Sequence, residues 1–182
     1  FFTPASIDNP NIPIMIAGVN TGLARLAGET SDGFLVHPYH SPRYLREVLL
    51  PAIEAGASDH GRSRADVSMV VNAFVVTNES ERAYARQQIS FYASTPSYRP
   101  VMEMHGWGEA AQQLSALAGR QQWAEMGEMV SDEMLNTFAT VAEEGDLAAA
   151  LQERYAGLAD RLTLYTPFIP GERDSFWRDL VK

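Results

Sequence analysis

Short apolar segments alternate with segments of helical spacing along most of this 182-residue chain, and that alternation limits the fold more than any other feature. Three apolar, strand-like segments, each followed by a helical pattern, are residues 12–17, 34–36 and 67–76. The first is nearly all apolar, as expected for a parallel strand covered on both faces. Strict alternation of strand and helix predicts a parallel sheet with helices outside it, in an open doubly wound sheet or a barrel.

Capping residues mark the starts of two predicted helices. Ser41 followed by Pro42 is an N-cap with proline at the first helical position, and the apolar stripe behind it predicts a helix that ends near Gly56. Asn78 with Glu81 three residues later resembles a capping box, which predicts a helix directly after the third strand.

The second half of the chain contains an insertion before the alternation resumes. We interpret residues 94–108 as a long loop, which in compact domains is usually functional or mobile, followed by helical segments. Residues 161–166 predict a fourth strand, and residues 172–181 predict a last helix. Four strands of a barrel would leave two apolar edges unpaired. We therefore expect residues 1–182 to be a single domain that is incomplete at its N-terminus.

Composition excludes several classes of function. The chain has no cysteine, which excludes disulfides, thiolate catalysis and cysteine-ligated metals. A net charge of −9 argues against nucleic acid or an anionic membrane as a partner, because both are bound through Lys and Arg. The sequence has neither the ~20 consecutive apolar residues of a membrane helix nor a signal peptide at its start. We expect a cytoplasmic protein that acts on a small molecule.

The strongest local signal for a binding site is the junction of the first strand and its helix, at Ala17, Gly18, Val19, Asn20 and Thr21. Glycine lets the backbone approach a ligand, and free N–H groups at a helix start favour an anion, so phosphate is the natural ligand. The segment lacks the three-glycine dinucleotide fingerprint and the P-loop Lys. A plain structural turn is an equal alternative.

Other polar residues fall near the same edge. His37 ends the second strand, where it either lines a pocket or only hydrogen bonds to neighbouring loops. It could pair with His40 on a metal, but no carboxylate accompanies them, and we expect no metal site. Asn72 points into a polar barrel interior or is a satisfied buried amide. His105 and Trp107 form a lid or pack on the surface.

Several segments resemble a known family. Residues 14–20 (IMIAGVN), 26–29 (LAGE), 32–34 (DGF), 36–38 (VHP) and 155–165 (YAGLADRLTLY) resemble the second half of the luciferase-like monooxygenases. The resemblance is to the actinobacterial type that uses the deazaflavin coenzyme F-420. It implies a (β/α)8 TIM-type barrel of which this chain is the C-terminal half, about four parallel strands with outer helices and a helical insert.

The resemblance also implies a function. Backbone groups of Gly18, Val19 and Asn20 would contact the phosphate-bearing tail of F-420, and His37 would border the cofactor pocket. Val19 departs from the family's usual second glycine. The reaction would be hydride transfer between the deazaflavin and an organic substrate; alternatives are an FMN-dependent monooxygenase that uses O2, and a non-catalytic flavin-binding or assembly half-barrel. Catalytic residues would come from the first half, so we assign none, expect this chain alone to be inactive, and expect a homo-oligomeric parent.

Overall fold

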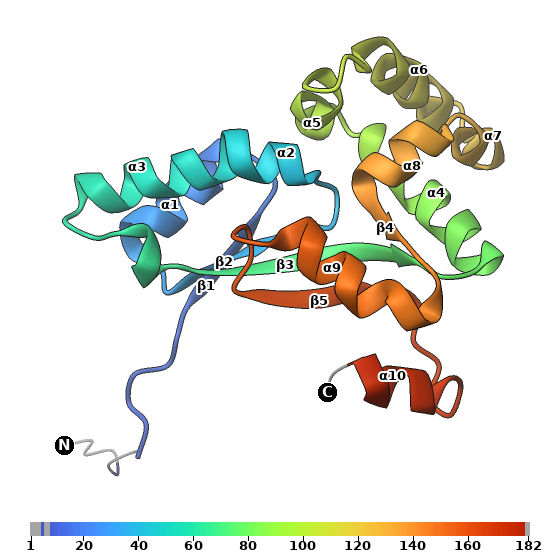
Figure 1. Ribbon diagram of the computed structural model, residues 1–182. Coiled ribbons are helices and arrows are strands. Elements are labelled where there is room, and N and C mark those ends of the chain that lie inside the picture. The colour runs from blue at the N-terminus through green and yellow to red at the C-terminus, as the bar shows by residue number, and fades with distance from the viewer. Residues whose placement is uncertain (1–4, 6–7, 181–182) are drawn as a thin grey trace.

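The computed structural model describes residue 5 and residues 8–180, and its centre is a parallel sheet of five strands (Figure 1). These are β1 (Met15–Gly18), β2 (Gly33–Val36), β3 (Ser68–Val76), β4 (Ala139–Val141) and β5 (Arg161–Tyr165). The predicted parallel sheet is confirmed, and four of its strands lie where the sequence pattern predicts them. The three-residue strand β4 was not predicted, because it is too short to show a periodic pattern.

β3 is the central strand, and its neighbours change along its length. At Val70 it pairs with β2 on one edge and with β5 on the other, whereas at Phe74 it pairs with β4 and β5. β2 and β4 therefore follow one another along the same edge of β3. Pairing with β2 ends at Val71 and pairing with β4 begins at Phe74, so Asn72 lies where one neighbour replaces the other.

The first two connections are helical. The helices are α1 (Thr21–Thr30) after β1, and after β2 a continuous run of α2 (Pro42–Tyr44), a π-helical turn (Leu45–Leu49) and α3 (Leu50–Asp59). The predicted N-cap is confirmed, because the Ser41 side chain accepts from the Tyr44 N–H. The helix continues past Gly56, whose missing side chain admits a neighbouring helix instead: a Cβ atom there would lie 2.1 Å from the Arg25 carbonyl oxygen.

The predicted long loop is wrong. After α4 (Glu79–Ala93), capped by Asn78 as predicted, the chain forms a helical insert at the carboxyl end of β3 (Figure 1). The insert consists of a 3-10 turn (Pro96–Tyr98), α5 (Arg99–Glu103), α6 (Gly108–Gly119), α7 (Trp123–Glu128) and α8 (Asp132–Phe138). Proline at the start of each of the first two elements is compatible with a helix. Buried Val101 and Met102 fix these helices to the core.

The remaining elements are two 3-10 turns (Arg64–Asp66 and Glu144–Asp146), α9 (Leu147–Tyr155) between β4 and β5, and α10 (Asp174–Leu180) after β5. α9 crosses one side of β3 and β5 in Figure 1, and α10 lies beside β5. Leu151, Leu162, Leu164 and Leu180 line one shared hollow, so α9, β5 and α10 are neighbours.

The two faces of the sheet differ in covering. One face, which we call the covered face, carries Phe34, Val36, Met69, Val71 and Ala73, all at most 1% exposed. Their alternate neighbours point to the other side, since successive side chains of a strand face opposite ways. On this open face, Ala17 and Thr163 are exposed and Leu35 and Asn72 are half-buried, whereas Val70 and Phe74 are buried, the latter against the rings of Tyr92 and Tyr165.

The first βα unit exposes some of its apolar residues. Leu23 and Leu26 are 46% and 41% exposed, and α1 buries Ala24, Ala27 and Gly28 instead. Small residues serve because α1 and α3 approach closely: a Cβ at Gly28 would lie 2.1 Å from the Ile53 carbonyl oxygen. The first strand was predicted to be covered on both faces, but Ala17 in β1 is exposed, so one face is open.

Within residues 5 and 8–180, no helix is sufficiently long and apolar to span a membrane.

Candidate functional site

The turn between β1 and α1 lies at the carboxyl edge of the sheet, where parallel α/β folds bind ligands. α1 has ten residues, no acidic side chain in its first turn, and an N-cap residue, Asn20, whose side chain does not cap it. The first N–H groups of a helix have no intrahelical partners. Thr21 and Gly22 are exposed, and a Cβ at Gly22 would meet nothing within 4 Å. The turn has room for an anion at the positive end of the helix dipole.

The Asn20 side chain ties this turn to two other segments. Its Nδ2 donates to the Ser97 carbonyl over 2.7 Å, and its Oδ1 accepts from the Tyr44 hydroxyl at 3.3 Å. Ser97 belongs to the 3-10 turn of the helical insert, and Tyr44 to the helix after β2. The amide is therefore held by elements from two other βα units.

The other residues of the predicted phosphate turn have different environments. Ala17 is exposed on the open face, whereas the Val19 side chain is buried in the core. The missing side chain of Gly18 leaves space for Leu23, whose Cβ would lie 2.8 Å from an added Cβ. The structure thus explains the Gly18 glycine by packing of α1 on β1. The open position is Gly22, one residue beyond the predicted set.

His37 is attached to the same turn. Its N–H donates to the Gly18 carbonyl over 3.1 Å, and its ring Nδ1 accepts from the Tyr39 N–H at 3.1 Å. A neutral imidazole whose Nδ1 accepts carries its hydrogen on Nε2. Burial lowers the pKa of His37, which favours this neutral form. No described group hydrogen bonds to Nε2, so the His37 ring keeps a free N–H donor.

His40 does not share a ligand site with His37. Its Nδ1 lies 2.9 Å from the His37 carbonyl oxygen, and its Nε2 lies 3.2 Å from the Tyr155 hydroxyl. Both ring nitrogens thus have partners within the protein, and His40 is only 1% exposed.

Aromatic rings surround His37 on the open side. The Tyr92 ring meets it edge-on at 4.6 Å between centroids, and the Tyr98 ring lies at 5.1 Å. The Tyr92 hydroxyl is 2.8 Å from that of Tyr165, and burial raises the pKa of Tyr92. Phe74 packs against Tyr165 at 5.0 Å. Sequence reasoning missed this cluster, although Tyr165 at a strand end was a signal for it.

Asn72 is both on the open face and satisfied. Its Nδ2 donates to the Val36 carbonyl over 2.9 Å, and its Oδ1 accepts from the Thr163 hydroxyl. The amide thus bridges the gap where β2 leaves β3 and holds the residue before His37.

His105 and Trp107 pack on the insert. Their rings stack at 5.2 Å and both meet the buried Phe138 ring, while His105 Nε2 lies 2.8 Å from the Ser41 Oγ. These contacts favour the packing interpretation over that of a lid.

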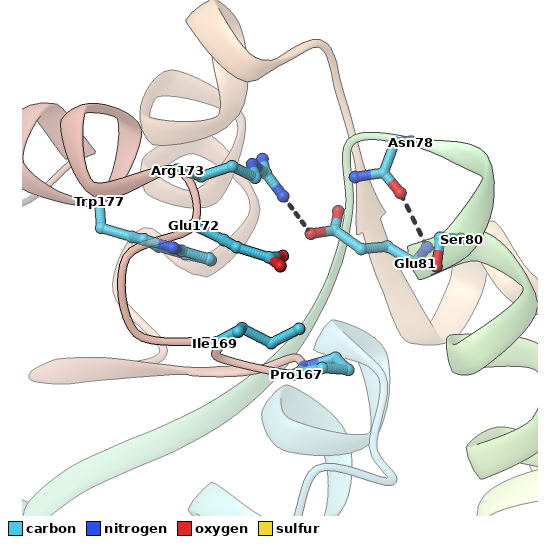
Figure 2. Close-up of a pocket in the computed structure, with 8 residues that line it drawn as sticks. All are labelled: Asn78, Ser80, Glu81, Pro167, Ile169, Glu172, Arg173 and Trp177. Carbon is cyan, nitrogen blue, oxygen red and sulfur yellow. Dashed lines mark hydrogen bonds and ion pairs between the residues drawn. The ribbon is translucent and has the colours of Figure 1, made fainter.

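A pocket of about 200 Å³ lies where β3 meets α4 (Figure 2). Arg173 points across it towards Glu81, with Nη1 and Oε1 2.6 Å apart, and its Nη2 lies 2.7 Å from Glu144 Oε1 and 2.9 Å from Thr77 Oγ1. The Arg173 charge is therefore paired, and it ties the segment before α10 to the sheet. A paired charge leaves no reason to assign an anionic cofactor to this pocket.

Parallel βα units with a candidate site at the carboxyl edge fit part of a (β/α)8 barrel as well as an open sheet. The profile of a family described as luciferase-like monooxygenase matches residues 1–161, and the chain belongs to that family.

Relatives support both family and fold. An uncharacterized protein of Mycobacterium tuberculosis is 40% identical over 88% of this chain and 49% of its own length. The 5,10-methylenetetrahydromethanopterin reductase of Methanolobus tindarius is 31% identical over 79% of this chain and 44% of its own length. The chain thus spans about half the length of these curated relatives.

Solved structures have the same fold. The coenzyme F-420-dependent tetrahydromethanopterin reductase of Methanopyrus kandleri matches with a TM-score of 0.68 and 19% identity, over 84% of this chain and 44% of that one. An F-420-dependent secondary alcohol dehydrogenase, in complex with an F-420–acetone adduct, matches with a TM-score of 0.55 and 15% identity over 86% and 43% of the two chains. The predicted family and barrel fold are confirmed.

Proposed function

We propose that the β1–α1 turn and His37 bind the phosphate-bearing part of deazaflavin coenzyme F-420, in an oxidoreductase that transfers hydride between this cofactor and a small organic substrate. Relatives named as F-420-dependent enzymes support the choice of cofactor. The proposed contacts come from Ala17, Gly18, Val19, Asn20, Thr21 and His37.

One observation carries the proposal. The hydrogen bond from the His37 N–H to the Gly18 carbonyl holds the backbone of this strand-end histidine against the turn that precedes α1. An anion there would meet helix N–H groups and the helix dipole, together with the neutral N–H donor at His37 Nε2. The negative net charge does not oppose this, because these donors act locally.

The chemistry would come from the cofactor, which supplies or accepts the hydride when bound. The residues of this chain would bind and orient it, and the half-buried rings of Tyr92, Tyr98 and Tyr165 would exclude water beside His37. We assign no catalytic residue.

The test is a calorimetric or fluorescence titration of oxidised F-420 and of FMN. It uses this chain and a form extended upstream to the length of its relatives. We expect the extended form to bind F-420 at micromolar concentration or tighter. A preference for FMN would favour the monooxygenase alternative, and binding without turnover would favour a non-catalytic half-barrel.

Substitution of His37 tests whether the binding measured by titration occurs at the proposed site. His37→Ala should weaken F-420 binding about tenfold, because it removes one hydrogen bond to a charged group, on the order of 1.5 kcal/mol. His60→Ala is the matched control, since His60 is exposed after α3 and its ring contacts the Gly56 carbonyl. Equal affinities of the two variants, or no binding of either cofactor, would contradict the proposal.

A further inference from the structure

His40 is a fully buried imidazole that the proposed cofactor site does not use. It follows β2 by four residues, and its backbone N–H donates to the Pro38 carbonyl over 3.1 Å. Its ring bridges two elements: Nδ1 is 2.9 Å from the His37 carbonyl oxygen, and Nε2 is 3.2 Å from the hydroxyl of Tyr155 at the end of α9.

These partners fix where the hydrogens lie. A carbonyl oxygen only accepts, so His40 Nδ1 must carry a hydrogen and donate it. Burial is the main cause that lowers the pKa of His40 to about 4, and the nearby Arg154 and His37 lower it further. The ring is therefore neutral at pH 7, so Nε2 carries no hydrogen and accepts from Tyr155.

His37 is held by hydrogen bonds at its backbone N–H, its carbonyl and its ring Nδ1. Its N–H is bound to Gly18, its carbonyl accepts from His40, and its ring Nδ1 accepts from the Tyr39 N–H. The Tyr92 and Tyr98 rings flank the imidazole. Nε2 is left as the one polar atom of His37 without a described partner.

We propose that His40 is a positioning residue for the cofactor site: its bond to the His37 carbonyl, which Tyr155 supports from the far side, holds the His37 backbone so that the ring keeps its Nδ1 on the Tyr39 N–H and its Nε2–H free for a ligand. The identity of the ligand rests on the proposed function, whereas the orientation of His37 does not. α9, which covers the other side of the sheet, thereby takes part in setting the binding edge.

The test compares three variants of the natural protein, with whatever sequence adjoins residues 1–182. His40→Asn keeps an amide N–H close to the place of Nδ1 and loses the Tyr155 contact. His40→Leu loses both contacts, and Tyr155→Phe removes only the distant hydroxyl. His60→Leu is the control, because it also removes a ring bonded to a carbonyl, at an exposed position.

Two readouts separate positioning from stability. The first is the ¹⁵N chemical shifts of the His37 ring without ligand, which report whether Nε2 carries the hydrogen. The second is the F-420 dissociation constant beside the melting temperature. We expect His40→Asn to keep the His37 signature and bind within about threefold of the natural protein, and His40→Leu to lose the signature and bind about tenfold more weakly, although both melt at similarly lowered temperatures. We expect Tyr155→Phe to fall between them.

Two results would overturn the proposal: a His37 ring signature that is unchanged in His40→Leu, or affinities of His40→Asn and His40→Leu that fall equally and follow their melting temperatures. If the natural protein binds no F-420, the proposed function fails, and the ¹⁵N shifts alone still decide whether His40 positions His37.

Discussion

The two faces of the sheet differ in the exposure and polarity of their side chains. On the covered face, Phe34, Val71 and Ala73 have no exposure and pack under helices. On the open face, Asn72 and Thr163 hydrogen bond to each other and Ala17 is exposed. The covered face resembles any protein interior, in which apolar burial supplies most of the stability. The open face keeps polar groups in register, as a surface that meets a ligand or another part of a barrel requires.

The same difference appears in two histidines three residues apart. His40 turns to the covered side, where Tyr155 of α9 satisfies it. His37 turns to the open side, among Tyr92 and Tyr98, and keeps one donor free. In the proposed account, the buried His40 on one side supports the proposed binding group, His37, on the other.

The largest expected effect is on the covered face. Phe34→Ala should lower the free energy of unfolding by about 3–5 kcal/mol, because it removes a fully buried ring and leaves a cavity. Leu35→Ala, next in sequence but half-buried on the open face, should cost about 1–2 kcal/mol. Urea denaturation measures both. Equal losses would show that the two faces do not differ in covering.

The second expected effect is a loss of stability at acidic pH, caused by protonation of His40. The pKa of His40 is lowered to about 4 from the ordinary 6.5. Between these two pH values the His40 imidazole is protonated in the unfolded chain but stays neutral in the folded protein. Stability is therefore lost as pH falls from about 6.5 to about 4, by at most about 3 kcal/mol. Urea midpoints at stepped pH should show this slope, and His40→Gln should remove most of it. His60→Gln is the control and should keep the pH dependence of the natural protein. If His40→Gln also kept it, the burial of His40 would be contradicted.

A third pair of substitutions compares two glycines of α1. Gly28→Ala should destabilise by about 1–3 kcal/mol, because its Cβ would meet the backbone of α3 at 2.1 Å. Gly22→Ala should stabilise by about 0.5–1 kcal/mol, since it improves helix propensity where the space is open. Thermal denaturation gives both signs. Stabilisation by Gly28→Ala would disprove the close contact of α1 with α3.

The covered face was predictable from sequence, whereas much of the site was not. Apolar runs and caps such as Ser41 and Asn78 depend on local pattern, which a sequence displays directly. The hydrogen bond of Asn20 to Ser97 joins residues 77 positions apart, and that of His40 to Tyr155 joins residues 115 apart. Such contacts depend on tertiary packing, and no local pattern encodes them. The exposure of Leu23 could not be predicted for the same reason, because helical spacing does not reveal which side of a helix its neighbour covers.

The most direct test of the central claim, that the start of α1 is the anion site, compares Gly22→Asp with Gly22→Ala in the protein extended to the length of its relatives. An acidic residue in the first turn interacts favourably with the helix dipole, by about 0.3–1 kcal/mol, so the melting temperature should stay the same or rise. The same negative charge should repel an anionic cofactor. We predict that Gly22→Asp binds F-420 about tenfold more weakly than Gly22→Ala. Equal affinity of the two variants would contradict the account.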